Sequence, residues 1–251
     1  MALAVVTGAS SGIGAATAKL LAENGFEVIA AARRIDRLNQ LASSIPNVEA
    51  MELDVTSQES VNQFISKLAG RQVAVLINNA GGAFDSISIE NANPDIWQKS
   101  YEVNVIGALR ITKALLPNLR SNKSAHIVVV TSTAGHGVYE NGGSYTSAKH
   151  AALAFTQTLR LELNGEPIRI TEIAPGMVMT EEFSLNRLGS KEAAAKVYEG
   201  VTEPLTAEDV AETIRWSVML PAHVNIDSLI VRPVAQAANY KLHRKNNPNN
   251  E

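Results

Sequence analysis

The chain contains no cysteine, few aromatic residues and no long hydrophobic run, and these absences exclude several classes of function. Without cysteine, its 251 residues can form no disulfide, no thiolate metal ligand and no cysteine nucleophile. No stretch reaches the roughly 18 apolar residues of a membrane span. The apolar run Ala2–Val6 lacks the preceding basic residues of a secretory signal. We therefore expect a cytoplasmic protein with no membrane partner.

An excess of charge of one sign is also missing. The 22 basic and 25 acidic residues give a net charge of −3, so no overall field favours nucleic acid as a partner. With 45% hydrophobic and 19% charged residues, the chain can build a large buried core. We find no linker or internal repeat, and we expect one domain over residues 1–245. Residues 246–251 have the low complexity of a disordered tail.

Short β-branched runs alternate with helical patterns along the chain. This alternation predicts a single α/β domain of the Rossmann type, with a doubly wound parallel sheet of about seven strands and helices on both faces. The expected strands are Leu3–Val6, Glu27–Ala31, Val48–Leu53, Val73–Ile77, His126–Thr131, Ile168–Ile173 and Ser228–Val231. Capping patterns predict helix starts at Thr56–Glu59, Asn93–Pro94 and Thr206–Asp209.

A glycine-rich turn, TGASSGIG at 7–14, follows the first expected strand and leads into a run of good helix formers. Glycines let the backbone approach a ligand, and a helix N-terminus offers free N–H groups and partial positive charge to a pyrophosphate. The spacing departs from the commoner G-x-G-x-x-G form, and a merely structural turn is the alternative. The predicted dinucleotide contacts are Gly8, Ser10, Ser11, Gly12, Ile13 and Gly14.

The end of the second expected strand separates NAD from NADP. A site for NAD usually has an acidic residue there for the ribose 2′-hydroxyl, but this chain has Arg33 and Arg34. Guanidinium groups suit the 2′-phosphate of NADP (NADPH) because they donate charge-assisted, bidentate hydrogen bonds. The alternative is a solvated basic pair beside Asp36. Asp54, after the third strand, could accept a hydrogen bond from adenine or simply begin a helix.

Tyr145 and Lys149 lie one helical turn apart in the run YTSAK. A tyrosine with an ordinary pKa of about 10 is a poor acid or base at neutral pH, but a nearby cation stabilises the phenolate. Ser132 precedes this pair at the end of an expected strand, where active-site groups gather in open parallel sheets. These three side chains form a candidate catalytic set.

The order of these motifs resembles that of the classical short-chain dehydrogenase/reductase family over essentially the whole chain. The matching features are TGASSGIG, NNAG at 78–81, Asn104 in NVIG, Ser132, YTSAK and PG at 175–176. The resemblance implies that Tyr145 is the general acid/base and that Lys149 lowers its pKa and holds the nicotinamide ribose. It implies that Ser132 orients the substrate carbonyl and that Asn104 helps to hold a proton-relay water. Further implied cofactor contacts are Asp54, Val55, Asn79, Ala80, Gly81, Pro175, Gly176, Val178 and Thr180.

The C-terminal third is similar to that of NADP-dependent 3-hydroxy acid dehydrogenases, which oxidise serine and allo-threonine and reduce malonic semialdehyde. The similar runs are Thr180–Ser184, Pro204–Leu205 with Glu208–Ala211, and Leu220–Ile226. An additional Glu182 departs from the family pattern. Reduction of sulfoacetaldehyde or another small aldehyde is one alternative, and a dinucleotide sensor without turnover is another. The intact Ser132, Tyr145 and Lys149 argue against the sensor.

A substrate lid is expected around residues 178–205. Within it, Arg187 is a candidate partner for a substrate carboxylate or sulfonate, unless it pairs with the neighbouring Glu181 and Glu182. The histidines are not arranged at metal-ligand spacing, so we expect no metal site and interpret His136, His150 and His223 as surface or supporting residues.

A homo-oligomer is expected from the apolar residues around the expected helices Ile96–Leu119 and Ala148–Leu163, which exceed what one sheet can cover. The family resemblance implies that this oligomer is a homotetramer with two-fold interfaces. The stretch Val234–Arg244 keeps many apolar residues for a terminus, and similar enzymes extend such tails over a neighbouring subunit. Local packing on the same chain is the alternative.

Overall fold

One parallel sheet of seven strands forms the centre of the molecule, in a computed structural model that describes residues 1–245. The strand order is β3-β2-β1-β4-β5-β6-β7, which confirms the predicted doubly wound topology. The strands are β1 Ala2–Thr7, β2 Phe26–Ala32, β3 Val48–Glu52, β4 Val75–Asn78, β5 Ala125–Val130, β6 Ile168–Pro175 and β7 Ser228–Val231. The order reverses between β1 and β4, so the crevice at their carboxyl ends is the place where such sheets bind ligands. The tail expected at 246–251 lies outside the described residues.

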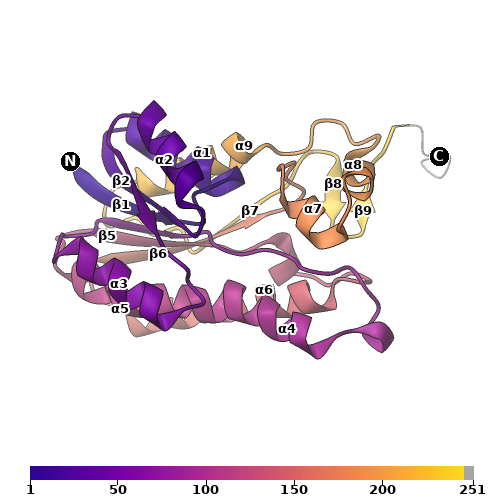
Figure 1. Cartoon of the computed structure of the whole chain (residues 1–251), viewed down its shortest axis with the longest axis horizontal. Coiled ribbons are helices and arrows are strands. Elements are labelled where there is room, and N and C mark those ends of the chain that lie inside the picture. Colours follow the sequence, from indigo (N-terminus) through magenta and orange to yellow (C-terminus); the bar gives the residue numbers. More distant parts are fainter. Residues whose placement is uncertain (246–251) are drawn as a thin grey trace.

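Helices cover both faces of the sheet (Figure 1). On one face lie α1 Gly12–Glu23, α2 Ile35–Ser44 and α9 Ala207–Val218, and on the other lie α3 Gln58–Leu68, α5 Gly107–Arg120 and α6 Gly143–Glu162, with α4 Pro94–Tyr101 against α6. Leu21, Leu38 and Ile214 fill the first layer, and Phe64 and Leu115 the second. Burial of these apolar side chains on the two faces fixes the strand ends that carry the polar groups.

Local sequence signals set several of the helix starts. Asn93 accepts a hydrogen bond from the Asp95 N–H, 2.9 Å away, at the start of α4. Thr206 and Asp209 form the predicted reciprocal capping box of α9. At α3 the expected box beginning at Thr56 is wrong, because Ser57 is the N-cap and Thr56 donates its hydroxyl to the Asp54 carboxylate instead. Each cap satisfies N–H groups that the first helical turn leaves unpaired.

The expected helix around Ile96–Leu119 is divided by a π-helical turn, Glu102–Ile106, between α4 and α5. Gly107 follows this turn, and a Cβ there would lie 2.7 Å from a methyl carbon of Val55. Pro117 lies inside α5 without ending it. Single π turns within helices are frequent at functional sites, and this one places Asn104 beside the loop after β4.

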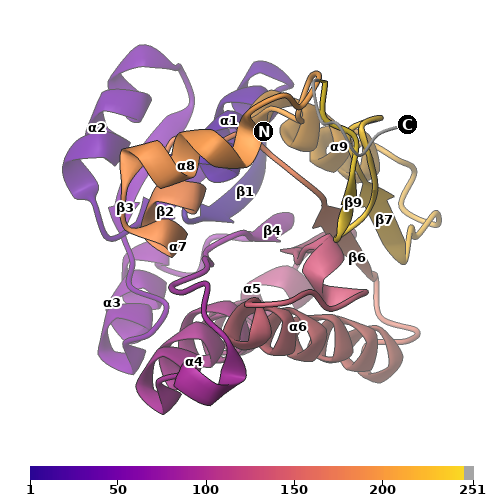
Figure 2. The ribbon, with the colours of Figure 1, turned by 90° about the vertical axis from the view of Figure 1, so that its right-hand side faces the viewer.

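Part of the C-terminal third lies over the carboxyl ends of the strands (Figure 2). It includes α7 Phe183–Leu188, α8 Lys191–Tyr198 and a hairpin of β8 Gln236–Ala238 and β9 Lys241–Leu242. The Met177 N–H donates to the Gln236 side chain at 2.8 Å, and the Asn239 amide donates to the carbonyls of Thr133 and Gly137. Residues 236–245 thus pack on their own chain, and a contact of this tail with a neighbouring subunit stays a prediction. Within residues 1–245, no helix has the length and apolarity to cross a membrane.

Candidate active site

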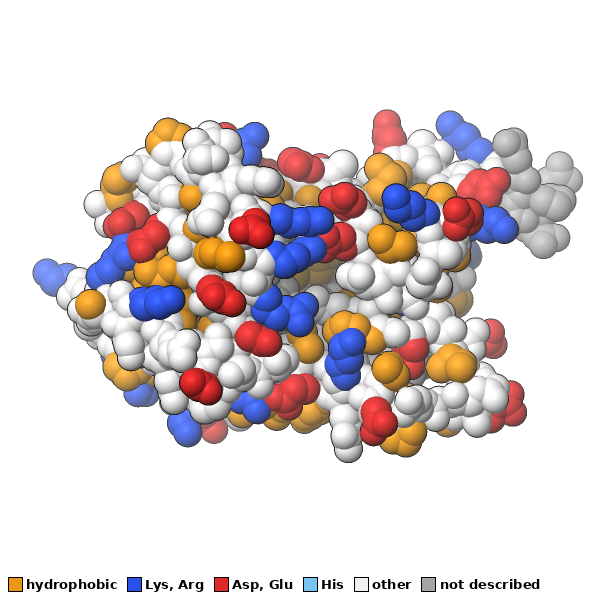
Figure 3. Space-filling view, viewed as in Figure 1, with side chains coloured by type: hydrophobic (Ala, Val, Ile, Leu, Met, Phe, Trp, Pro, Cys, Tyr) orange, Lys and Arg blue, Asp and Glu red, His pale blue; other side chains and the backbone are white. Residues whose placement is uncertain are grey.

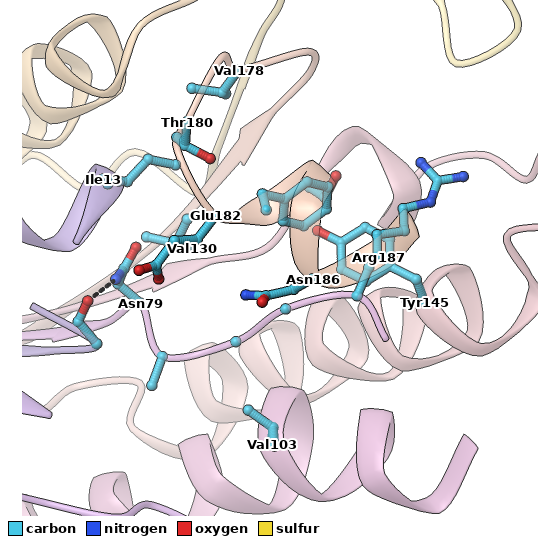
Figure 4. A pocket seen from close by; sticks show the side chains of 18 of the residues that line it. Ile13, Asn79, Val103, Val130, Tyr145, Val178, Thr180, Glu182, Asn186 and Arg187 are labelled. Atoms are coloured by element: carbon cyan, nitrogen blue, oxygen red, sulfur yellow. Dashed lines mark hydrogen bonds between the residues drawn. The ribbon is translucent and has the colours of Figure 1, made fainter. Parts of the chain in front are cut away.

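A cavity of about 910 Å³ opens at the carboxyl ends of the strands, between the sheet and the lid. The turn after β1 forms one end of its wall, and the segment after β6 together with α7 forms the other (Figure 4). The predicted site residues that line it are Gly8, Ser10, Ser11, Gly12, Ile13, Arg33, Arg34, Asp54, Val55, Asn79, Ala80, Gly81, Ser132, Tyr145, Lys149, Pro175, Gly176, Val178, Thr180 and Arg187. The fold therefore brings nearly the whole predicted set together.

The glycines after β1 allow the backbone to pass close to its neighbours. Gly8 and Gly12 have φ values of 67° and 53°, in the left-handed region that favours glycine. A Cβ on Gly14 would lie 2.4 Å from the Gly8 carbonyl oxygen and 2.5 Å from the Asn79 amide nitrogen. The Ser11 side chain does not cap α1, so the helix N-terminus keeps N–H groups for an anion. This cradle fits the pyrophosphate of a dinucleotide.

The NNAG segment is held to the same turn. The Thr7 hydroxyl accepts hydrogen bonds from the N–H groups of Asn79 and Ala80, both at 3.0 Å, and the Asn79 amide donates to the Thr7 carbonyl at 3.0 Å. A Cβ on Gly81 would lie 2.6 Å from Asn104. These bonds fix the floor of the cavity between β1 and β4.

Asp54 lies in the turn between β3 and α3, and Ser57 rather than Asp54 begins the helix. Its carboxylate accepts from the N–H and the hydroxyl of Thr56 at 2.9 and 2.7 Å, which shapes the turn before α3. It also lines the cavity. A hydrogen bond to adenine remains a prediction from the sequence.

Asn104 is fixed by the backbone around it and does not line the cavity. Its amide nitrogen donates to the carbonyls of Gly82 and Ser100 at 2.9 and 2.8 Å, and its oxygen accepts from the Gly82 N–H at 3.1 Å. The side chain is almost fully buried, at 3% exposure. It therefore joins the π turn to the loop after β4, and its role with a relay water stays a prediction.

Ser132, Tyr145 and Lys149 come together at one end of the cavity. The Lys149 ammonium donates to the Val130 carbonyl at 3.1 Å and lies 5.7 Å from the centre of the Tyr145 ring. Tyr145 packs edge-on against Phe183 of the lid, with ring centres 5.5 Å apart. The backbone and α6 thus place a phenol, a hydroxyl and an ammonium around one small volume.

Burial dominates the protonation of this set. Burial raises the pKa of Tyr145, although a hydrogen bond with Ser132 acts to lower this pKa. It lowers the pKa of Lys149 to about 8, while the charge of Glu172 acts to raise it. The expected lowering of the Tyr145 pKa by Lys149 is thus not seen, because desolvation disfavours the phenolate more strongly than the neighbouring groups favour it. Tyr145 is held as a neutral phenol, the form that donates a proton.

Glu172 is a buried charged group that the sequence did not reveal. Its carboxylate accepts from the Ser228 hydroxyl at 2.6 Å and lies 2.9 Å from His136 Nε2. The side chain is 1% exposed. His136 is therefore a supporting residue, as expected. Among residues 1–245, no group of three or more acidic or histidine side chains could hold a metal ion.

Arg187 enters the cavity from α7, and within residues 1–245 it has no acidic partner. It donates to the Ser86 hydroxyl at 3.1 Å and stacks 5.4 Å above the Tyr139 ring. Its Nε is buried and makes no hydrogen bond within residues 1–245. The alternative that Arg187 pairs with Glu181 or Glu182 is wrong, because Glu182 binds Arg34 and Arg37 and Arg187 donates to Ser86 instead of to Glu181.

Arg34 and Arg37 hold Glu182 in ion pairs at the opposite end of the cavity. In the part of the chain that is described, Arg33 and Arg34 are exposed and neither pairs with Asp36, so the expected pairing with Asp36 is wrong, while the assignment of the arginines to a 2′-phosphate stays a prediction. Arg37 and the wall residues Gln236 and Asn239 were missed by the sequence analysis. Arg37 could have been found from its place one helical turn after Arg33 and Arg34.

Comparison with known proteins agrees with this geometry. Residues 2–188 match the family model described as short chain dehydrogenase. An uncharacterized oxidoreductase of Mycobacterium tuberculosis is 49% identical over 94% of this chain and 92% of its own. The NADP-dependent 3-hydroxy acid dehydrogenase YdfG of Salmonella typhi is 37% identical over 96% of this chain and 99% of its own.

A solved structure supports the same relationship. The closed form of a serine dehydrogenase complexed with NADP⁺ superposes with a TM-score of 0.89 at 33% identity, covering 97% of this chain and 100% of its own. The similarity therefore includes the lid and the C-terminal hairpin as well as the sheet.

Proposed function

Because the chain belongs to the short-chain dehydrogenase family of oxidoreductases, which act on alcohol and carbonyl groups, we propose that it uses NADP(H) to interconvert a small 3-hydroxy acid and its carbonyl form. Serine, allo-threonine and 3-hydroxypropionate are the candidate substrates. The observation that carries the proposal is Arg187, a guanidinium without an acidic partner among residues 1–245, in the same cavity as Tyr145. A carboxylate two bonds from the reacting carbon would supply the missing partner.

The preference for NADP rests on the basic groups near the turn after β1. Arg34 donates to the Ser10 and Ser11 hydroxyls at 2.9 and 3.0 Å. Arg37 lies beside Arg34, and both guanidiniums bind the carboxylate of Glu182. A 2′-phosphate carries about two negative charges and fits such a group of donors. The NADP⁺-bound serine dehydrogenase and the NADP-dependent YdfG support this choice.

The chain's own groups account for the proton transfer. When bound, the nicotinamide supplies or accepts the hydride at the substrate carbon. In reduction, the Tyr145 hydroxyl gives its proton to the carbonyl oxygen, and Ser132 holds that oxygen by a hydrogen bond. Lys149, protonated below its pKa of about 8, compensates the negative charge left on the phenol. Phe183 packs on Tyr145 from the lid side.

Replacing Arg187 with methionine is expected to lower kcat/KM for malonic semialdehyde by about 10- to 100-fold, since a charge-assisted hydrogen bond contributes roughly 1.5–3 kcal/mol. For propanal, which has no anionic group, the loss is expected to stay below about threefold. Steady-state kinetics with NADPH measure both values.

The matched control is Lys191→Met, which removes an exposed cation from the next lid helix. It should leave both values near those of the wild type. Equal losses for the charged and the neutral aldehyde in Arg187→Met would refute the anion-binding role. Sulfoacetaldehyde, the alternative substrate, belongs in the same panel because a sulfonate would use the same guanidinium.

A homotetramer in the cytoplasm remains part of this proposal. Tyr101 and Leu109 expose apolar surface on α4 and α5, and Leu161 does so on α6. Exposed apolar side chains on neighbouring helices favour association between copies. Tyr240, in the hairpin, is 83% exposed and is available to a second subunit.

Deleting residues 236–251 is expected to lower the assembled mass and to raise the substrate KM together. The mass falls because Tyr240 is lost, and KM rises because Gln236 and Asn239 are removed from the cavity wall. Light scattering and steady-state kinetics give the two readings. A variant with unchanged mass and unchanged KM would dispose of both roles of the tail.

A further inference from the structure

The Glu182 carboxylate occupies the donors that the sequence assigns to a phosphate of the cofactor. It accepts a hydrogen bond from Arg34 Nη2 at 2.8 Å and another from the Ser11 hydroxyl at 3.0 Å. Arg37 and the second nitrogen of Arg34 bind its other oxygen. Carboxylates and phosphates share the negative charge and the bidentate fit to a guanidinium. Glu182 therefore stands in for a bound anion.

These partners shift the pKa of Glu182 to about 2, with the Arg34 hydrogen bond as the largest cause. The carboxylate is ionised at any neutral pH. Its side chain is 21% exposed, while that of Arg34 is 43% exposed, so the arginines shield the acid from solvent. Figure 3 shows basic and acidic side chains side by side next to the hollow on this face.

Glu182 also fastens the lid to the nucleotide end of the site. It is the residue before α7, and its carbonyl accepts the Asn186 N–H at 2.8 Å. Arg187 follows in the same helix. Figure 4 shows Glu182 toward the end of the cavity where Ile13 and Asn79 lie, with Tyr145 and Arg187 toward the other end. One short segment thus joins the two ends of the site.

We propose that Glu182 is a cofactor-specificity residue that competes with the 2′-phosphate of the dinucleotide for Arg34 and Arg37. The inference rests on the proposed preference for NADP. A carboxylate and a phosphate cannot share this pair of arginines at close range without repulsion, so a bound 2′-phosphate displaces Glu182. The displacement frees the start of α7, which links the nucleotide end of the site to the helix that carries Arg187.

Two nucleotides without a nicotinamide separate the 2′-phosphate from the rest of the cofactor. Adenosine 2′,5′-bisphosphate and adenosine 5′-monophosphate share the adenine, the ribose and the 5′-phosphate. Calorimetric titration of wild type and Glu182→Gln with each is the test. The variant is expected to bind the bisphosphate roughly three- to tenfold more tightly and the monophosphate within about twofold, because a partly exposed ion pair gives effects of this size.

Glu181→Gln is the matched control. It removes the same charge from the adjacent position, where the side chain is exposed and makes no ion pair within residues 1–245. The charge of Glu181 acts on Arg34 without a hydrogen bond, so the selective tightening should be clearly smaller in this variant than in Glu182→Gln. If both variants bound the bisphosphate more tightly by the same factor, the net charge of the lid would explain the effect. That result would overturn the proposal that Glu182 competes with the 2′-phosphate.

Hydrogen exchange of residues 183–188 gives a second reading that does not depend on turnover. In the wild type, the bisphosphate should speed exchange in this segment, because it removes the Glu182 attachment and has no nicotinamide end to hold the lid. The monophosphate should have no such effect. In Glu182→Gln, exchange should be fast already and unchanged by either nucleotide. Equal protection in all these states would overturn the link to the lid.

The outcomes separate the inference from the proposed cofactor. Selective binding of the bisphosphate by the wild type, with no change in Glu182→Gln, overturns the inference alone. Equal binding of the two nucleotides by both proteins overturns the inference and the NADP preference. Selectivity that appears only in Glu182→Gln supports the inference and overturns the preference in the natural chain.

Discussion

Replacing Tyr145 with phenylalanine is expected to lower kcat by about 10²–10⁴-fold, the usual contribution of a general acid or base. The substitution removes the proton that reduction requires and keeps the ring. The edge contact with Phe183 and the position over Lys149 therefore persist. NADPH affinity, measured by fluorescence titration, should stay within about twofold of the wild type because no charged contact is lost.

Tyr139→Phe is the matched control for this prediction. Tyr139 also lines the cavity, and burial also raises its pKa, but its ring lies under Arg187. Phenylalanine preserves that stacking, so kcat should change by less than about fivefold, the worth of one ordinary hydrogen bond. A Tyr145→Phe enzyme that keeps more than about a tenth of the wild-type kcat would refute its role as the proton donor.

Replacing Arg33 and Arg34 together with glutamine is expected to raise KM for NADPH by about 100-fold and KM for NADH by less than about threefold. Two guanidiniums on a 2′-phosphate provide several charge-assisted hydrogen bonds. Because both arginines are exposed, we expect these bonds to contribute about 2.7 kcal/mol in all, which corresponds to the roughly 100-fold change in KM for NADPH. Initial rates with each cofactor at saturating substrate give the two constants.

Arg215→Gln serves as the control because Arg215 lies on α9 in an ion pair with Glu212, outside the residues that line the cavity. It should change neither constant. If the double variant raised both KM values equally, the arginines would be structural rather than selective. A wild-type enzyme that prefers NADH would also show that the two arginines do not select the cofactor.

The sheet and its helices were predictable because they depend on local patterns. Each predicted strand overlaps a strand of the sheet, and Asn93 and Thr206 begin helices where their capping patterns indicate. These signals involve neighbours in the sequence. The π turn at Glu102–Ile106 has no comparable signal, since it arises where α4 and α5 meet the loop after β4.

The candidate site was predictable where one motif supplies the geometry, as in the glycine turn and the pair Tyr145 and Lys149. Long-range pairings were not. Glu182 and Arg34 are 148 positions apart, and nothing local indicates that the lid meets the arginines. The raised pKa of Tyr145 was missed for the same reason, because burial is a property of the folded cavity.

The substrate preference of the wild-type enzyme tests the central claim most directly. NADP⁺ reduction is measured with 3-hydroxypropionate and with 1-propanol, which lacks the carboxylate. The account predicts that kcat/KM for the hydroxy acid exceeds that for the neutral alcohol by about 100-fold or more, as expected for a guanidinium-bound carboxylate. Equal values, or NADP⁺ binding without turnover of any alcohol in a panel that includes serine and allo-threonine, would contradict it.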